Sequence, residues 1–169
     1  VIISTTQVAV GGTTPAVLLP TNWVNTGEDC CDNTGSDGTV NGTTNFTMAS
    51  ANVNNVNFGI EQLPNSDVVT EPVQTNPGGT TNVSVSAASF GATDPDGGTV
   101  TAIRITAFPT NATSITINGV QYTTLVAIQT AYPNGIATNA AGEPTVPVLI
   151  DPVDGNVNVV INYAAIDNA

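Results

Sequence analysis

The segment Asp94-Pro95-Asp96-Gly97-Gly98 is the part of the sequence best suited to chemistry. Two carboxylates two residues apart, followed by glycines, form a tight acidic turn that can direct several oxygen atoms at one cation. Calcium accepts flexible oxygen ligands of this kind. The same pattern fits an Asx-type turn whose carboxylates are solvated by water. The sequence therefore leaves a calcium site and a plain turn as the two interpretations of this segment.

A second acidic segment, Asp151-Pro152-Val153-Asp154-Gly155, precedes the last expected strand, and Asp167 follows that strand. If the fold brings two of these acidic loops to one end of the molecule, their carboxylates could share an ion. The candidate calcium ligands are therefore Asp94, Asp96, Asp151, Asp154 and Asp167.

The charge balance of the chain excludes several classes of function. One basic side chain, Arg104, stands against thirteen acidic ones, and there is no histidine, so the formal charge is −12. Without histidine the usual general base is missing. One guanidinium cannot form a phosphate clamp or a basic track for nucleic acid, and anionic lipid repels the chain. We expect neither an enzyme nor a nucleic-acid-binding or membrane-inserted protein.

Two cysteines, Cys30 and Cys31, are neighbours in the sequence. They allow two free thiols, a disulfide to another chain, or a disulfide between the neighbours, which would close a strained ring. The flanking Glu28, Asp29 and Asp32 disfavour a thiolate by like-charge repulsion, which argues against a reactive nucleophile. The sequence leaves the three pairings open.

The elements that must position these residues are expected to be strands. β-branched residues dominate the apolar positions and turn residues recur every few positions, which is the pattern of an all-β sandwich. The polar, Pro-containing segment Leu63-Pro64-Asn65-Ser66-Asp67 is typical of a domain boundary. We expect an N-terminal β unit at residues 1–63, with a long polar surface loop at 25–45, and a β-sandwich at 64–169.

Several local patterns refine this expectation. Residues 1–10 read as an opening strand, and Trp23 as a core anchor. Asn118-Gly119 between β-branched residues predicts a type I′ hairpin turn. Residues 125–132 fit one or two helical turns or a crossover between sheets. Arg104 is expected within a strand, paired with a carboxylate. The strands expected in the second unit are 68–74, 82–86, 99–108, 114–117, 120–123, 145–150 and 156–166.

Several of these segments together resemble repeat modules of very large bacterial surface adhesins, of the Ig-like or cadherin-like kind found in Bacteroidetes. The resemblance is carried by the runs FGATDPDGG (90–98), SITINGVQY (114–122), IDPVDG (150–155), NYAAIDNA (162–169) and VNFGI (56–60). It covers roughly residues 56–169 and implies one or two Greek-key β-sandwich units in a secreted, surface-attached or filamentous protein. The family's calcium turns would carry over to Asp94 and Asp96, and more weakly to Asp151, Asp154 and Asp167.

Two functions follow as expectations. The first is a structural or adhesive extracellular subunit that pairs through strands with copies of itself or adjacent modules, since strand edges without lysine invite pairing. Its assembly residues would be Val1, Ile2, Ile3, Val8 and Val10. The second is a calcium-assisted carbohydrate-binding module that uses the Asp/Asn loops to recognise glycans or surfaces.

Overall fold

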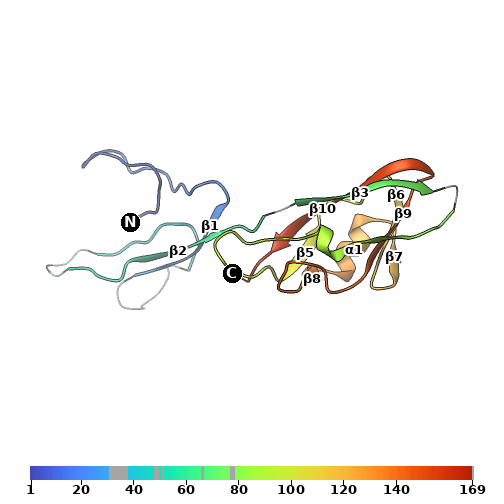
Figure 1. Ribbon diagram of the computed structural model, residues 1–169. Coiled ribbons are helices and arrows are strands. Elements are labelled where there is room, and N and C mark those ends of the chain that lie inside the picture. Colours follow the sequence, from blue (N-terminus) through green and yellow to red (C-terminus); the bar gives the residue numbers. More distant parts are fainter. Residues whose placement is uncertain (31–37, 48–49, 51, 66, 77–78, 169) are drawn as a thin grey trace. The chain divides into compact units, whose positions relative to one another are not determined.

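The chain folds into two compact units, Val1–Leu63 and Pro64–Asn168, which are described separately. The computed structural model describes residues 1–30, 38–47, 50, 52–65, 67–76 and 79–168 (Figure 1). Its strands form three antiparallel sheets, and the expected all-β sandwich class is confirmed.

Unit 1 is built on a two-stranded sheet. Strand β1 (Trp23–Asp29) pairs antiparallel with β2 (Asn57–Gln62), with a bulge between Asn25 and Gly27. The sandwich expected in one or two copies is therefore found in unit 2, because the strands described in unit 1 form this single sheet.

The N-terminal segment of unit 1 pairs with its own unit. Ile2 bridges Thr43, and Ser4 bridges Leu18. The Ile3 amide donates to the Gly42 carbonyl at 2.9 Å. The expected continuous strand over residues 1–10 is wrong, because the contacts are isolated bridges and every residue from 5 to 14 is exposed.

The polar loop expected at residues 25–45 is wrong at its start. Residues 25–29 belong to β1, and Glu28 is buried with 4% of its surface exposed. The prediction relied on polar composition, which is typical of surface loops. The Glu28 carboxylate can be buried in a strand because it accepts hydrogen bonds from the backbone amides of Asn41 and Gly42. Trp23, expected as a core anchor, is only half-buried.

Unit 2 is a sandwich of two four-stranded sheets, with strand orders β3-β10-β5-β8 and β4-β9-β6-β7. Two short helices, η1 and α1, interrupt the strands. In chain order the elements are β3 (Asp67–Asn76), β4 (Val83–Val85), η1 (Ala87–Ser89), β5 (Ala102–Ile105), β6 (Ala112–Ile117), β7 (Val120–Tyr122), α1 (Leu125–Ala131), β8 (Ile136–Ala137), β9 (Val148–Pro152) and β10 (Gly155–Ile166).

The core of unit 2 comes from alternate residues of these strands. Strand β10 buries Val159, Ile161 and Tyr163, the period of two expected for a strand with one buried face. The Tyr163 ring packs against Phe90 with ring centroids 5.4 Å apart, and its hydroxyl donates to the Phe90 carbonyl. This contact joins the last strand to the segment that leads into the acidic turn.

Two local predictions in unit 2 are confirmed. Asn118 and Gly119 have φ angles of 50° and 79°, which suits a type I′ turn between β6 and β7. Helix α1 begins at the N-cap Thr124, whose side chain accepts a hydrogen bond from the Ala127 amide at 3.3 Å, and buries Ile128. The helix connects β7 of one sheet to β8 of the other, so it is also the crossover.

The only basic side chain, Arg104, lies on β5 and is exposed. Its Nη2 donates to the Pro133 carbonyl oxygen at 2.7 Å. The sequence led us to expect a carboxylate partner here, whereas the guanidinium binds a backbone carbonyl just after α1.

A substitution that leaves a cavity in the core of unit 2 should destabilise the fold. Ile150 on β9 is fully buried, so Ile150→Ala should lower the free energy of unfolding by about 2–5 kcal/mol. Urea denaturation followed by circular dichroism measures the change. The control is Val120→Ala at an exposed strand position, which should cost below about 1 kcal/mol. Equal losses in the two variants would contradict the assignment of β9 to the core.

Candidate functional site

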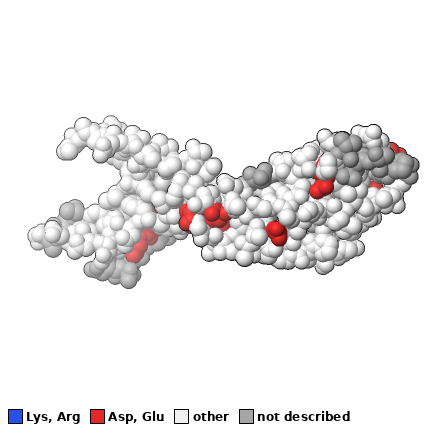
Figure 2. All heavy atoms as spheres, viewed as in Figure 1, with Lys and Arg blue, Asp and Glu red and all other residues white. Residues whose placement is uncertain are grey.

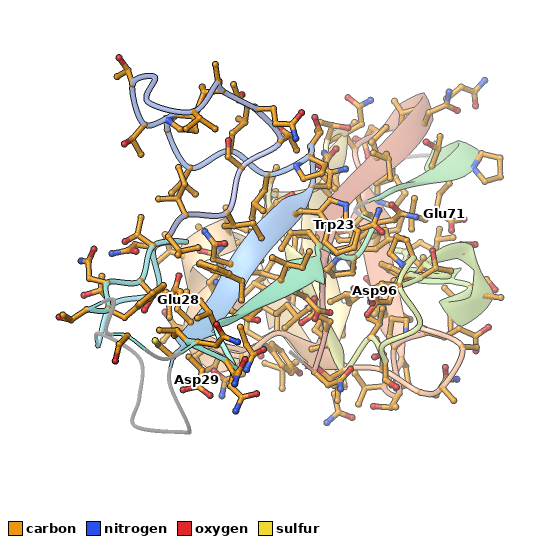
Figure 3. All side chains as sticks on the ribbon, turned by 90° about the vertical axis from the view of Figure 1, so that its left-hand side faces the viewer. Trp23, Glu28, Asp29, Glu71 and Asp96 are labelled. Carbon is orange, nitrogen blue, oxygen red and sulfur yellow. The ribbon has the colours of Figure 1, made fainter. Side chains whose placement is uncertain are left out.

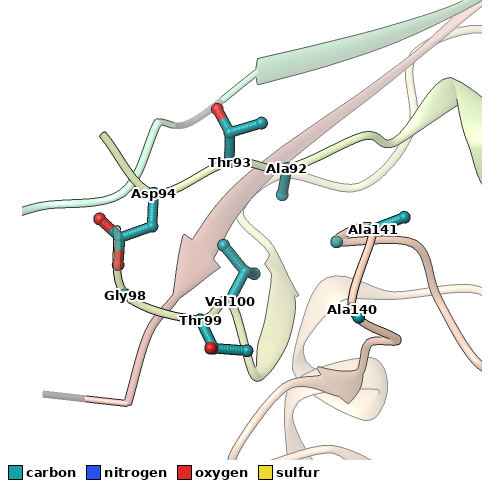
Figure 4. A pocket seen from close by; sticks show the side chains of 9 residues that line it. Ala92, Thr93, Asp94, Gly98, Thr99, Val100, Ala140 and Ala141 are labelled. Atoms are coloured by element: carbon teal, nitrogen blue, oxygen red, sulfur yellow. The ribbon is translucent and has the colours of Figure 1, made fainter. Parts of the chain in front are cut away.

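The acidic turn of unit 2 connects the segment after η1 to β5. The Asp96 amide donates to Asp94 Oδ1 at 3.3 Å, and the Gly98 amide donates to Asp96 Oδ1 at 3.4 Å. These are the bonds of consecutive Asx turns. A Cβ atom at Gly98 would overlap Asp94 Oδ2, so glycine is needed there for the carboxylate to fold over the turn (Figure 4).

The end of the chain after β10 runs beside this turn. The Thr101 hydroxyl donates to the Asp167 carbonyl at 3.0 Å, and the Thr99 amide donates to Asn168 Oδ1 at 2.7 Å. The turn and the segment after β10 thus place Asp94, Asp96 and Asp167 in one region of unit 2. The sequence analysis missed Asn168, although its position directly after Asp167 was a signal.

The carboxylate of Asp94 has a raised pKa. Desolvation raises its pKa, and the negative charges of Asp96 and Asp167 raise it further, while the hydrogen bond from the Asp96 amide opposes the shift. Its Oδ2 atom is buried and has no hydrogen-bond partner in the described structure. A carboxylate in this environment gains from a proton or from a cation.

The other two candidate ligands lie elsewhere in unit 2. Asp151 is a buried residue of β9, and its Oδ2 accepts a hydrogen bond from the Thr113 hydroxyl at 2.7 Å. Asp154 is exposed in the turn that precedes β10. Asp154 and Asp167 flank opposite ends of a twelve-residue strand, roughly 40 Å apart at the rise of an extended chain.

Asp154 therefore does not meet the acidic turn, because β10 spans the length of the sheet between Asp154 and Asp167. The two acidic segments that do come together are the turn with Asp94 and Asp96 and the segment with Asp167. Calcium binding by Asp94, Asp96 and Asp167 stays a prediction.

A pocket of about 310 Å³ lies beside the acidic turn (Figure 4). One wall is the loop around Gly142, where the Ala92 amide donates to the Gly142 carbonyl at 3.3 Å. Gly142 has a φ of +72°, and a Cβ there would overlap the Ala92 carbonyl oxygen. The pocket is lined by Ala92, Thr93, Asp94, Gly98, Thr99, Val100, Ala140, Ala141 and Gly142.

Asn139 holds this loop in shape, because its Oδ1 accepts hydrogen bonds from the amides of Ala141 and Glu143 at 2.9 and 3.1 Å. The sequence analysis did not single out this loop. Its local signal is the spacing of Asn139, Gly142 and Pro144, which is typical of a tight turn.

The remaining candidate residues belong to unit 1. Val1, Val8 and Val10 are 56%, 48% and 107% exposed, whereas Ile2 and Ile3 are half-buried by the bridges described above. Cys30 is buried and disulfide-bonded, so the free-thiol interpretation is wrong for this residue. Cys31 lies outside the described residues.

Figure 2 shows that most of the drawn face is uncharged, with a few groups of acidic side chains on it. Within the described part of the chain, no helix has the length and apolar character required to cross a bilayer. Comparison with protein-family models, with curated proteins and with solved structures found no match. The likeness to adhesin repeats therefore depends on the sequence motifs alone.

The raised pKa of Asp94 has a consequence for stability. A group whose pKa is higher in the folded than in the unfolded state stabilises the fold at low pH, and this contribution is lost as pH rises through the folded pKa. In chelator, Asp94→Asn should therefore melt no lower than the parent at neutral pH. The parent should lose stability as pH rises above the ordinary aspartate range, and Asp94→Asn should lose less over the same range because it lacks this titrating group.

Thermal melting monitored by circular dichroism over a pH series measures this effect. Asp154→Asn, which removes an exposed carboxylate from the turn before β10, is the matched control. A lower melting temperature for Asp94→Asn at neutral pH in chelator would show that the ionised carboxylate stabilises the turn.

Proposed function

We propose that the chain is a structural or adhesive module of a bacterial cell-surface protein, located outside the cell, which pairs through β-strands with copies of itself or with adjacent modules. The observation that carries this proposal is the exposed segment at residues 5–14 of unit 1. This segment carries Val8 and Val10, and its sequence contains no charged residue.

The physical argument starts from the backbone of this segment. Within this segment the Gly12 amide donates to the Ala9 carbonyl at 2.9 Å, and the Thr5 amide donates to the Leu18 carbonyl. An exposed, uncharged segment rich in β-branched residues presents backbone groups and apolar side chains that another chain can pair with. Strand addition of this type gains main-chain hydrogen bonds together with apolar contacts.

The β-bridges within unit 1 limit which of the candidate residues are available for pairing with another chain. Residues 1–5 are already joined to Leu18 and to residues 42–44 of the same unit. Of the five candidate assembly residues, Val8 and Val10 are the ones that this segment presents to a partner, while Val1, Ile2 and Ile3 contact other parts of unit 1.

Unit 2 supports a mechanical role. Its sixteen-residue buried core is a continuous apolar cluster between two sheets. Few residues of the sequence are charged, and most of its polar residues are Thr, Asn and Ser. Such a module separates or connects its neighbours without a reaction of its own.

Charge added to the exposed segment should block assembly. The double variant Val8→Asp/Val10→Asp places two negative charges where strands would pair, so it should need at least about tenfold more protein to associate. Light scattering across a concentration series, with electron microscopy of the concentrated samples, measures association. The control Thr80→Asp/Thr81→Asp adds the same charge at two exposed positions of unit 2, outside the segment at residues 5–14, and should associate like the parent. A parent that stays monomeric at the highest concentration would overturn the proposal.

The pocket beside Asp94 favours a second candidate, a carbohydrate-binding module that calcium assists. Its threonine hydroxyls and carboxylate are groups that hydrogen-bond sugars, and its volume is at the lower end of the range for small-ligand sites. None of its nine lining residues is aromatic, so it offers no stacking platform.

A glycan array probed with the chain, with calcium and with chelator, tests this candidate. If the pocket binds sugar, Ala141→Trp, which fills an exposed wall position, should abolish signals that the parent gives. Silence of the parent in both conditions would rule out the carbohydrate function.

A further inference from the structure

The Glu28 carboxylate of unit 1 is a buried charge with half of its hydrogen-bonding capacity unused. The residue is 4% exposed. Its Oε1 accepts hydrogen bonds from the backbone amides of Asn41, at 2.9 Å, and of Gly42. Its Oε2 is buried and has no hydrogen-bond partner in the described structure. The backbone thus fixes one oxygen of the carboxylate and leaves the other available to a ligand.

A second unpartnered oxygen lies on the same face of β1. The bulge pairs Asn25 with Ile60, Gly27 with Gly59 and Glu28 with Phe58, so Thr26 is the extra residue. Without the bulge, residues three apart would point to opposite faces. With it, Asn25 and Glu28 share one face, and Asn25 Oδ1 is also buried without a hydrogen-bond partner.

Both side chains converge on Gly42. The Gly42 amide donates to Glu28, and a Cβ placed on Gly42 would lie 2.9 Å from Asn25 Nδ2 and 2.6 Å from Val17 Cγ1. Gly42 has a φ of +74°, so the backbone adopts a left-handed conformation that brings its amide to the carboxylate. Figure 3 shows Glu28 and Trp23 near opposite ends of β1.

Unit 1 has no basic side chain with which to neutralise this carboxylate. The one basic residue of the sequence is Arg104, which belongs to unit 2 and binds the Pro133 carbonyl. The Val1 amino group donates to the Thr44 carbonyl oxygen at 2.7 Å. Buried charges in proteins are paired or coordinate metal ions, because an isolated one is costly to desolvate.

We propose that Asn25 and Glu28 form a binding site for a hard cation inside unit 1, with Asn25 Oδ1 and Glu28 Oε2 as ligands. Carboxylate and amide oxygens are the ligand types that calcium prefers. The cation neutralises the buried charge and satisfies both oxygens at once. This site is independent of the acidic turn in unit 2 and of the proposed assembly.

Terbium, used as a probe for calcium, tests the proposal through the single tryptophan. Trp23 lies two residues from Asn25 on the same strand face, about 7 Å along the strand. Its emission therefore sensitises terbium bound at the site, and the three tyrosines all belong to unit 2. The parent for the titration is the full chain carrying Asp94→Asn and Asp96→Asn, which removes both carboxylates of the acidic turn in unit 2.

In this parent we expect one saturable terbium site that calcium displaces. Adding Glu28→Gln keeps the side-chain shape and removes the charge, so half-saturation should need at least about tenfold more terbium. The matched control is Asp29→Asn, which removes a carboxylate from the next position, on the opposite face of β1, and should bind like the parent.

Three outcomes overturn the proposal: no sensitised emission in the parent, an unchanged titration for Glu28→Gln, or an equal loss in Asp29→Asn. Circular dichroism checks that each variant is folded. If Glu28→Gln does not fold, Asn25→Asp decides the question, because a second carboxylate should tighten terbium binding and make the melting temperature depend on calcium. Unchanged or weaker binding by folded Asn25→Asp would overturn the proposal as well.

Discussion

The shortage of positive charge is the constraint on which much of this structure depends. Thirteen acidic side chains share one guanidinium, and that guanidinium binds a backbone carbonyl. Acids that leave solvent must therefore be accommodated by neutral donors. Backbone amides hold one oxygen of Glu28, the Thr113 hydroxyl donates to Asp151, and amides of the acidic turn donate to Asp94 and Asp96. Where such donors run out, as at Asp94 Oδ2 and Glu28 Oε2, the chain has groups that favour a cation.

The same constraint shapes the surface and the function that we propose. A chain with few charges depends on threonine, asparagine and serine for its contact with water, and these residues leave exposed strand-forming segments without the lysines that usually block pairing. The segment at residues 5–14 is the clearest case, because all of it is exposed and it carries two valines. The compact apolar core of unit 2 is consistent with the mechanical role that we propose for the module.

Much of unit 2 could be predicted because its signals are local. The Asn118-Gly119 turn requires positive φ at both positions, and the alternation of Val159, Ile161 and Tyr163 marks a single buried face. Unit 1 was harder, because its polar strand β1 is stabilised by contacts with residues more than ten positions away. Composition placed residues 25–29 in a loop, whereas tertiary hydrogen bonds made them a strand.

The sequence by itself determined the all-β class, the hairpin, the acidic turn and the lack of basic groups, since each depends on residue type and short spacing. Only the tertiary structure decided which acids meet. Asp94, Asp96 and Asp167 come together because β10 ends beside the turn, while Asp154 is held at the far end of the same strand. It also decided that Glu28 is buried, because a single-residue bulge and the distant Gly42 amide set the environment of that carboxylate.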